Sequence, residues 1–319
     1  MTGAMPAADA VRDAIRRVGF GPSASFANLS ILSLLDPTEA EGDYLTLDDA
    51  LASGAARITE VSEDGRVSAL AVDVTGDRPV LLLDGEELLG AKQNRVANLT
   101  ILVPPGRRTV VPVSCVEAGR WERRSRAFRS APRTQFAEGR AARTKQVTES
   151  MLSAGERRSD QSAVWDLIEE KSARMATRSE TSAMSDVFDG HAASIEEFVA
   201  AFPPVARQVG AVFCIDGMPV GLEMFDSAAT WRKLGAKLVR SYALDAIDRG
   251  GRGGRGERWI DLASSRDFAT RVAEVEGAAF PAVGIGEDVR LTGGAAEGAA
   301  LVAEGRVVHL SAFPGGDIR

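Results

Sequence analysis

Polar side chains that could bind a ligand are clustered at residues 90–98, GAKQNRVAN, between two strongly apolar stretches of the chain. The guanidinium of Arg95 can form paired hydrogen bonds with a phosphate or a carboxylate. The amides of Gln93, Asn94 and Asn98 can donate and accept hydrogen bonds at a sugar or a base. We therefore expect these four residues to belong to a ligand-binding site.

Acidic and thiol side chains flank this segment. Glu87 precedes it, while Cys115 and Glu117 lie two residues apart on a later apolar stretch. Residues two apart on a strand point to the same face. Glu117, with Glu87, could accept hydrogen bonds from ribose hydroxyls or act as an acid or base. Cys115 could act as a nucleophile. Trp121 could form a wall of the pocket.

A purely structural interpretation is open for the same residues. Arg95 could form a buried salt bridge with Glu87 or Glu117, and the amides would then satisfy backbone groups at strand ends. Cys115 could be a small buried apolar side chain, because a carboxylate beside it raises the pKa of a thiol.

Hairpins are expected to position these residues. Strand-like runs flank Asp-Gly pairs, a signal for tight turns, at 64–65, 84–85 and 216–217. A further hairpin is predicted between Leu99–Val103 and Thr109–Glu117. It would place Cys115 and Glu117 beside Arg95 and Asn98.

Helices are predicted in the central part of the chain and again near its end. Asp160 can cap one helix, and Ser194 with Glu197 forms a capping box for another. A long amphipathic helix is expected over Ala228–Ile247, and a shorter one over Phe268–Val275. The last strands are expected at 282–285, 289–292, 300–303 and 307–310.

The predicted fold class is α+β, with antiparallel β-meander sheets, a central helical segment and returning C-terminal strands. We expect an N-terminal tail (1–22) and a single α+β domain (23–319). Within that domain we expect a β-rich part (23–121), an Arg-rich arm with helices (122–205), and a hairpin, helix and strands (206–319).

Composition restricts the class of protein. The chain has 319 residues, 45% of them hydrophobic and 26% charged, which is typical of a globular protein. Its formal net charge of −7 disfavours nucleic acid as a partner. We expect a cytoplasmic protein, because the N-terminus lacks a signal-peptide pattern and no apolar run is long enough for a membrane helix. The two cysteines and two histidines do not have metal-site spacing, so no metal is predicted.

Residues 120–145 carry nine basic and two acidic side chains. One interpretation is a non-catalytic interaction module whose exposed arm docks an acidic partner; the other is a solvated segment. The sequence RGGRGGRG at 249–256 is interpreted as a flexible loop.

The segment 84–121 resembles the signature of an uncharacterised bacterial domain family, which is associated with ADP-ribosylglycohydrolase and the rhodanese-phosphatase superfamily. The matching residues are Glu86-Glu87, Gly90, Gln93-Asn94-Arg95, Asn98, Val113–Glu117 and Gly119-Arg120-Trp121. The flanking plan fits more loosely over 23–315. The resemblance implies a link to NAD or ADP-ribose metabolism and supplies no assigned active site.

We therefore expect the chain to bind a small phosphorylated or ribosyl metabolite. Two alternatives are a hydrolase or transferase that depends on Cys115 or Glu117, and the interaction module. The sequence specifies neither a cofactor nor an oligomeric state.

Overall fold

The computed structural model describes residues 5–38, 41–63, 65–122, 125–250 and 260–316. Contacts divide the chain into two compact units, which are described separately. Unit 1 consists of Met1–Gly42, Glu196–Ala282 and Gly286–Arg319, and unit 2 of Asp43–Ile195 and Val283–Ile285. The α+β class is confirmed, and the single family domain over 23–319 stays a prediction.

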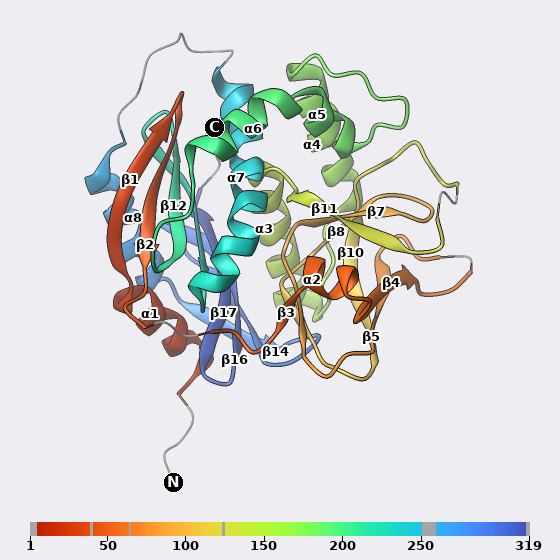
Figure 1. Cartoon of the computed structure of the whole chain (residues 1–319), viewed down its shortest axis with the longest axis horizontal. Helices are drawn as coiled ribbons and strands as arrows, with labels where there is room; N and C mark the ends of the chain where they lie inside the picture. Colours follow the sequence, from red (N-terminus) through yellow and green to blue (C-terminus); the bar gives the residue numbers. More distant parts are fainter. Residues whose placement is uncertain (1–4, 39–40, 64, 123–124, 251–259, 317–319) are drawn as a thin grey trace. The chain divides into compact units, whose positions relative to one another are not determined.

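Unit 1 is built on an eight-stranded antiparallel sheet (Figure 1). Its strands, in spatial order, are β1 (Gly19–Phe26), β2 (Leu29–Leu35), β12 (Gln208–Ile215), β13 (Met218–Phe225), β17 (Arg306–Pro314), β16 (Ala296–Ala303), β15 (Glu287–Thr292) and β14 (Gly277–Pro281). The β12–β13 hairpin was predicted from Asp216-Gly217, and the structure confirms it. The C-terminal strands return to the sheet that contains β1 and β2, although Val283–Ile285 lies outside β14.

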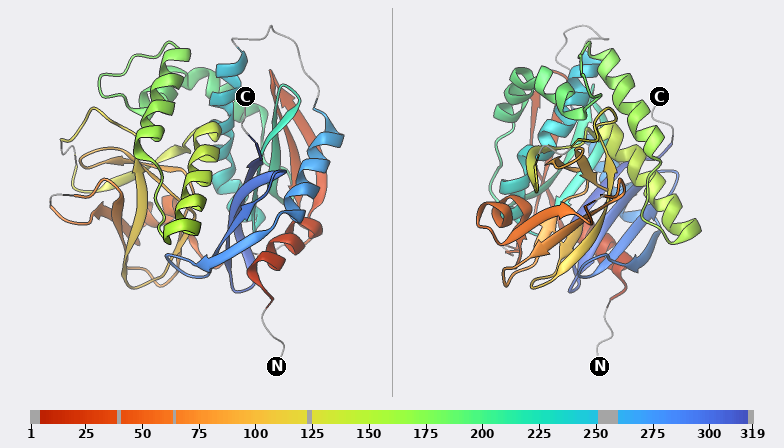
Figure 2. Two further views of the ribbon diagram at one scale, coloured as in Figure 1. Left: turned by 180° about the vertical axis from the view of Figure 1, so that it is seen from behind. Right: turned by 90° about the vertical axis from the view of Figure 1, so that its right-hand side faces the viewer.

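Helices pack on both faces of this sheet (Figure 2). The apolar stripe of α1 (Ala7–Arg17) and that of α8 (Leu262–Glu274) share one core with the sheet. On the other face α7 (Ala228–Gly250) packs against β12, and Tyr242 stacks on Phe213 with ring centroids 3.9 Å apart. The long helix and the helix around Phe268 were both predicted.

The segment expected as an N-terminal tail (1–22) includes α1, whose residues Val11 and Ile15 are buried, followed directly by β1. The domain boundary at residue 22 stays a prediction. The capping box predicted at Ser194 is wrong, because α6 (Ala192–Ala201) begins two residues before Ser194. The RGGRGGRG loop extends beyond α7 into residues 251–259, outside the described part.

Unit 2 contains a closed antiparallel barrel and a small three-stranded sheet. In spatial order the barrel strands are β10 (Arg108–Cys115), β5 (Ala69–Val74), β4 (Ala56–Glu60), β11 (Phe128–Thr134), β7 (Glu86–Gly90) and β8 (Arg95–Ala97). The small sheet has β3 (Leu45–Thr46), β6 (Val80–Leu82) and β9 (Ile101–Val103). The helices of this unit are α2 (Leu47–Ala52), α3 (Ala137–Ala154), α4 (Gln161–Arg174) and α5 (Met184–Gly190). Asp160 caps α4 as predicted, since its carboxylate accepts from two backbone N–H groups.

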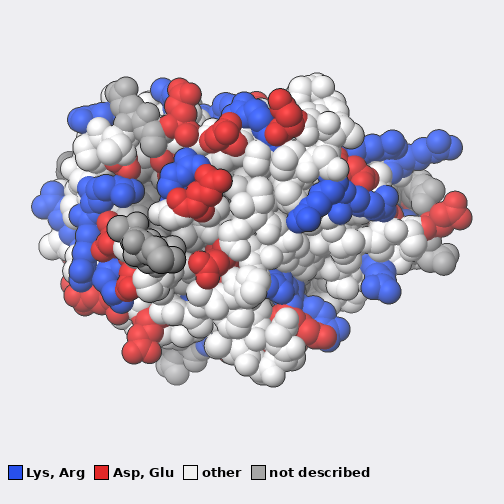
Figure 3. Space-filling model, turned by 90° about the horizontal axis from the view of Figure 1, so that it is seen from below, with Lys and Arg blue, Asp and Glu red and all other residues white. Residues whose placement is uncertain are grey.

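Barrel closure changes two of the predicted hairpins. The β4–β5 hairpin is confirmed, but β6 pairs with β3 and β9 rather than with β7. Likewise β10 pairs with β5 and β8, not with β9. The Arg-rich segment that was interpreted as an exposed arm contributes β11 to the barrel and then enters α3. Lys and Arg are interspersed with Asp and Glu over the face in Figure 3.

None of the helices in the described residues is both long and apolar enough to cross a membrane.

Candidate functional site

The segment between β7 and β8 forms a tight loop that carries the polar motif. Gly90 has a φ of 140°, and a Cβ built there would lie 2.7 Å from Oγ of Ser125 and 2.8 Å from the carbonyl oxygen of Ala127. Ser125 Oγ accepts a hydrogen bond from the N–H of Ala91 at 2.9 Å and donates to the Ala127 carbonyl at 2.7 Å. The loop is thereby fixed to the segment that leads into β11.

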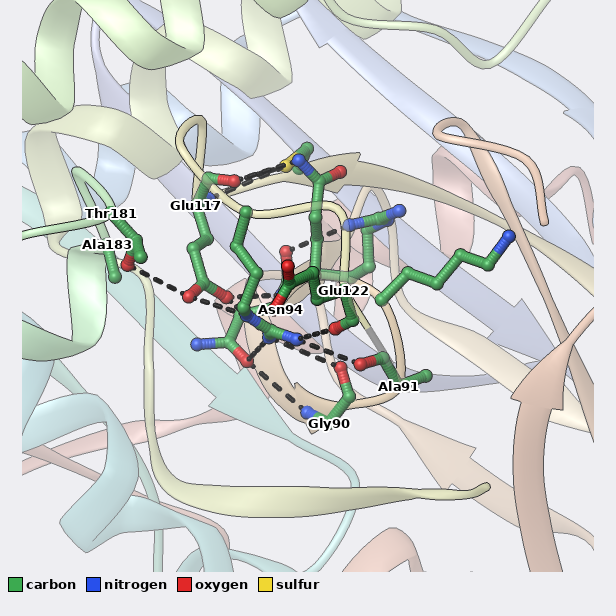
Figure 4. Close-up of polar contacts among 12 residues, drawn as sticks. Gly90, Ala91, Asn94, Glu117, Glu122, Thr181 and Ala183 are labelled. Atoms are coloured by element: carbon green, nitrogen blue, oxygen red, sulfur yellow. Dashed lines mark hydrogen bonds and ion pairs between the residues drawn. The ribbon is translucent and has the colours of Figure 1, made fainter. Parts of the chain in front are cut away.

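Glu117 and Arg120 form a buried ion pair that contacts this loop; Glu117 and the hydrogen bonds around it are drawn in Figure 4. The guanidinium binds the carboxylate through two hydrogen bonds, Nε to Oε1 at 2.8 Å and Nη2 to Oε2 at 2.6 Å. Its remaining donors reach the carbonyl of Ala91 at 2.8 Å and the side-chain Oδ1 of Asn94 at 3.2 Å. Arg120 therefore joins the motif loop to the end of β10.

The carboxylate of Glu117 is held in its charged form. It also accepts from the backbone N–H of Asn94 at 3.0 Å and from the hydroxyl of Thr181 at 2.9 Å. Burial raises the pKa of Glu117, but the hydrogen bonds from Arg120, Asn94 and Thr181 outweigh it, so the pKa lies below its ordinary value. Because both oxygens have partners, Glu117 is a structural anion rather than an available base.

The same stretch positions helix α5. Glu117 forms a β-bridge with Ala183, and the N–H of Met184 donates to the carbonyl of Val116 at 2.9 Å. These contacts come immediately before and at the start of α5. The ion pair thus organises the motif loop and the segment that leads into a short helix.

A cavity of about 580 Å³ opens beside this ion pair. Its walls come from β7, the motif loop, β11 and α5. The polar side chains in the lining are Asn94, Arg120, Ser125, Arg129, Arg133, Ser185, Asp186 and Asp189. This volume lies in the range typical of small-molecule sites.

Several polar groups in the lining are available to a ligand. The side chain of Arg129 is exposed and forms no ion pair or hydrogen bond with any described residue. The amide nitrogen of Asn94 and the hydroxyl of Ser185 likewise have no partner within the described ranges. Asp186 accepts from the hydroxyl of Ser179 at 2.5 Å, and Asp189 is paired with Arg133 but remains exposed. The cavity therefore offers donors and acceptors together.

Arg95, which the sequence suggested as the anion receptor, lies outside this lining. It is fully buried, and its Cζ lies 5.8 Å from the ring centroid of Trp121. Its Nη1 donates to the carbonyl of Asn94 at 3.3 Å, while Nε and Nη2 have no partner in the described part of the chain. Burial lowers the pKa of Arg95.

Two of the predicted amides tie strand ends together. Gln93 donates to the carbonyl of Glu117 at 3.0 Å. Asn98 accepts from the hydroxyl of Ser114 at 2.6 Å and donates to the carbonyl of Arg157 at 3.0 Å. These contacts agree with the structural interpretation of the amides.

The two predicted glutamates have other cationic partners than Arg95. Glu87 is fully buried, and its carboxylate accepts a hydrogen bond from Nε of Arg133 at 2.6 Å. Glu117 is paired with Arg120 in the same way. Burial raises the pKa of Glu87 despite this cation. The salt bridges suggested between Arg95 and either glutamate are therefore replaced by pairs with residues from the predicted Arg-rich arm.

Cys115 lies directly opposite Arg95 in the β8–β10 register and is fully buried. Burial raises the pKa of its thiol, although the charge of Arg95 opposes this. Cys214 is also fully buried, and burial raises its pKa to about 11. A buried thiol with a raised pKa is a poor nucleophile.

We expect neither cysteine to react with iodoacetamide in the native protein at pH 7.5, because both thiols are protonated and shielded. Mass spectrometry should find both alkylated only after denaturation. Rapid labelling of Cys115 under native conditions, with Cys214 unmodified as the internal control, would contradict this structure-based expectation.

The sequence reasoning missed the residues on β11 and α5 that line the cavity. Arg129 and Arg133 were placed in an exposed arm. Asp186 and Asp189 carried a usable signal, since carboxylates three residues apart on a helix share a face.

Trp121 is about half exposed and lies under Lys92, whose Nζ is 5.1 Å from the ring centroid.

Comparison with protein families gives one match. The model of the ARG and Rhodanese-Phosphatase-superfamily-associated Protein domain, ARPP-1, matches residues 17–313. The chain belongs to this family. No curated protein and no solved structure matches it. The ARPP-1 description names associated proteins and assigns no ligand or reaction.

Within the described residues, no group of three or more His, Cys, Asp or Glu could hold a metal ion.

Proposed function

We propose that this ARPP-1 chain binds a small hydroxyl-rich metabolite with one anionic group, of the ribosyl phosphate class, in the cavity beside Glu117 and Arg120. One observation carries the proposal. The same cavity lining contains the carboxylates of Asp186 and Asp189 and the guanidinium of Arg129, which has no ion-pair partner among the described residues.

The charge balance favours this class over a polyanion. Arg120 and Arg133 are matched by the buried carboxylates of Glu117 and Glu87. The lining then retains one unmatched cation and the two α5 carboxylates. A ligand with several anionic groups would have to place all but one of them near these carboxylates, whereas hydroxyl groups can donate hydrogen bonds to the carboxylates.

Each group has a role in the proposal. Arg129 binds the phosphate through charge-assisted hydrogen bonds. Asp186 and Asp189 accept from ribose hydroxyls, and the amide nitrogen of Asn94 donates to a ring or hydroxyl oxygen. ADP-ribose and NAD also contain a ribosyl phosphate, but their pyrophosphate adds a second anionic group, so a ribosyl monophosphate fits this charge balance better.

A catalytic role for Cys115 or Glu117 has less support. The thiol is buried away from the cavity lining, and both oxygens of Glu117 are bonded to protein groups. The function supported best is therefore binding, with the ion pair as the scaffold of the site.

We expect ribose 5-phosphate to bind in isothermal titration calorimetry and Arg129→Ala to weaken binding by about tenfold or more, as expected for loss of a hydrogen bond between charged groups. Ribose and inorganic phosphate should each bind more weakly than the joined ligand, because each uses only part of the lining.

Arg57→Ala is the matched control. Arg57 is an exposed arginine on β4 that lies outside the cavity lining. Absence of binding to the wild-type chain, or equal losses in both variants, would count against the proposal.

A further inference from the structure

A second cavity, of about 180 Å³, lies within unit 1. It is formed where β1 and β2 meet the end of α6, the Pro203-Pro204 segment and α7; the two strands and the two helices are labelled in Figure 1. An apolar cavity of about 150 Å³ is large enough for benzene. This cavity therefore has room for one six-membered ring with a short substituent.

The walls of this cavity are mostly apolar. Ile31 and Val239 contribute buried aliphatic surface, and the rings of Phe202, Pro203 and Trp231 close the sides. Aromatic guests gain specific edge and face contacts with such rings in addition to apolar burial.

Three polar groups in the lining have no partner among the residues that the structure describes. The indole N–H of Trp231 belongs to a side chain that is only 3% exposed, and the hydroxyl of Ser33 lies on a residue that is 6% exposed. Arg232 is exposed and forms no ion pair within the same ranges. Because these donors line the cavity without a protein partner in the described part of the chain, they can bind a polar substituent on the guest.

Gly235 keeps the edge of the indole accessible. A Cβ built on this residue would lie 3.1 Å from Cε2 and 3.3 Å from Nε1 of Trp231, and both residues line the cavity. The missing side chain thus leaves space beside the unpaired indole nitrogen.

We infer that this cavity binds a small aromatic carboxylate, with the ring among Ile31, Phe202 and Trp231 and the carboxylate bound by Arg232. The indole N–H of Trp231 and the hydroxyl of Ser33 donate to the same carboxylate or to a ring substituent. This inference is independent of the ribosyl phosphate site, because every lining residue lies in unit 1.

The test uses benzoate and benzyl alcohol as probes of the full-length chain, measured by calorimetry and by ligand-observed NMR. We expect saturable benzoate binding and at least tenfold weaker binding of benzyl alcohol, which has the same ring without the charge. No saturable benzoate binding, or equal affinities for the two probes, would overturn the inference.

Variants locate the binding. Arg232→Ala should lower the affinity for benzoate to roughly the affinity for benzyl alcohol. Arg16→Ala, an exposed arginine on α1 outside the lining, should leave both affinities unchanged. An Arg232→Ala chain that binds benzoate as tightly as the wild type would contradict the assignment.

Gly235→Ala provides a second test that does not change the charge. The added methyl group would lie 3.1 Å from Cε2 of Trp231, so it should weaken both probes several-fold by occupying space beside the indole. Circular dichroism checks the fold, and ribose 5-phosphate titration checks that the other site is unchanged. Undiminished binding of both probes by the folded variant would refute this location.

Discussion

Arg120→Ala is expected to lower the free energy of unfolding by about 3–5 kcal/mol, the usual cost of leaving one member of a buried ion pair without its partner. The side chains of Glu117 and Arg120 are 1% and 5% exposed. The variant leaves the Glu117 carboxylate without its cation and removes a donor from the carbonyl of Ala91. The motif loop and the end of β10 lose their common anchor.

Urea unfolding at pH 7 measures this effect, with Arg57→Ala expected to stay within about 0.5 kcal/mol of the wild type as an exposed control. A loss below about 1 kcal/mol for Arg120→Ala would contradict the role given to the ion pair, since exposed pairs contribute no more than that.

The pH dependence gives a further check on the same pair. The pKa of Glu117 is lowered in the folded state, so its stabilisation is fully present above the unfolded value of about 4.3 and is lost as pH falls through the folded pKa. The difference between wild type and Arg120→Ala should therefore shrink below about pH 4. A difference that grows on acidification would contradict the charged carboxylate.

Asp84→Ala is expected to destabilise the chain by at least as much, about 3–5 kcal/mol, because two buried guanidinium groups share this carboxylate. Nη2 of Arg140 lies 3.2 Å from Oδ2 of Asp84, and Nη2 of Arg143 lies 2.5 Å from Oδ1. Both arginine side chains are 0% exposed. They anchor α3 to the turn between β6 and β7.

Guanidinium chloride unfolding tests the Asp84 prediction. Asp166→Ala is the control, since Asp166 is an exposed carboxylate on α4. We expect the control to change stability by less than about 0.5 kcal/mol. Indistinguishable midpoints for the two variants would show that the cations do not depend on Asp84.

Local signals in the sequence predicted local structure well. The β12–β13 hairpin and the long helix α7 follow from a tight-turn signal and an apolar period, which act over a few residues. Asp84-Gly85 has the same turn chemistry, yet the strands on its two sides join different sheets. A turn signal fixes a change of direction and does not specify the strand with which the next segment pairs.

In the candidate site too, local contacts could be predicted from the sequence and long-range pairings could not. The sequence placed Cys115 near Arg95, and the register confirms that they face each other, although through β8 rather than the predicted hairpin. The cationic partners of Glu87 and Glu117 could not be predicted, because Arg133 and Arg120 were assigned to an exposed arm. Only closure of the barrel by β11 brings Arg133 to the buried carboxylate of Glu87.

A crystal structure with ribose 5-phosphate is the most direct test of the central claim, that the cavity beside Glu117 and Arg120 is a ligand site. We predict the phosphate within about 3 Å of the guanidinium of Arg129, and ribose hydroxyls at hydrogen-bond distance from Asp186 or Asp189. Well-ordered ligand bound elsewhere with this cavity holding only solvent, or the same pose in Arg129→Ala crystals, would contradict the account.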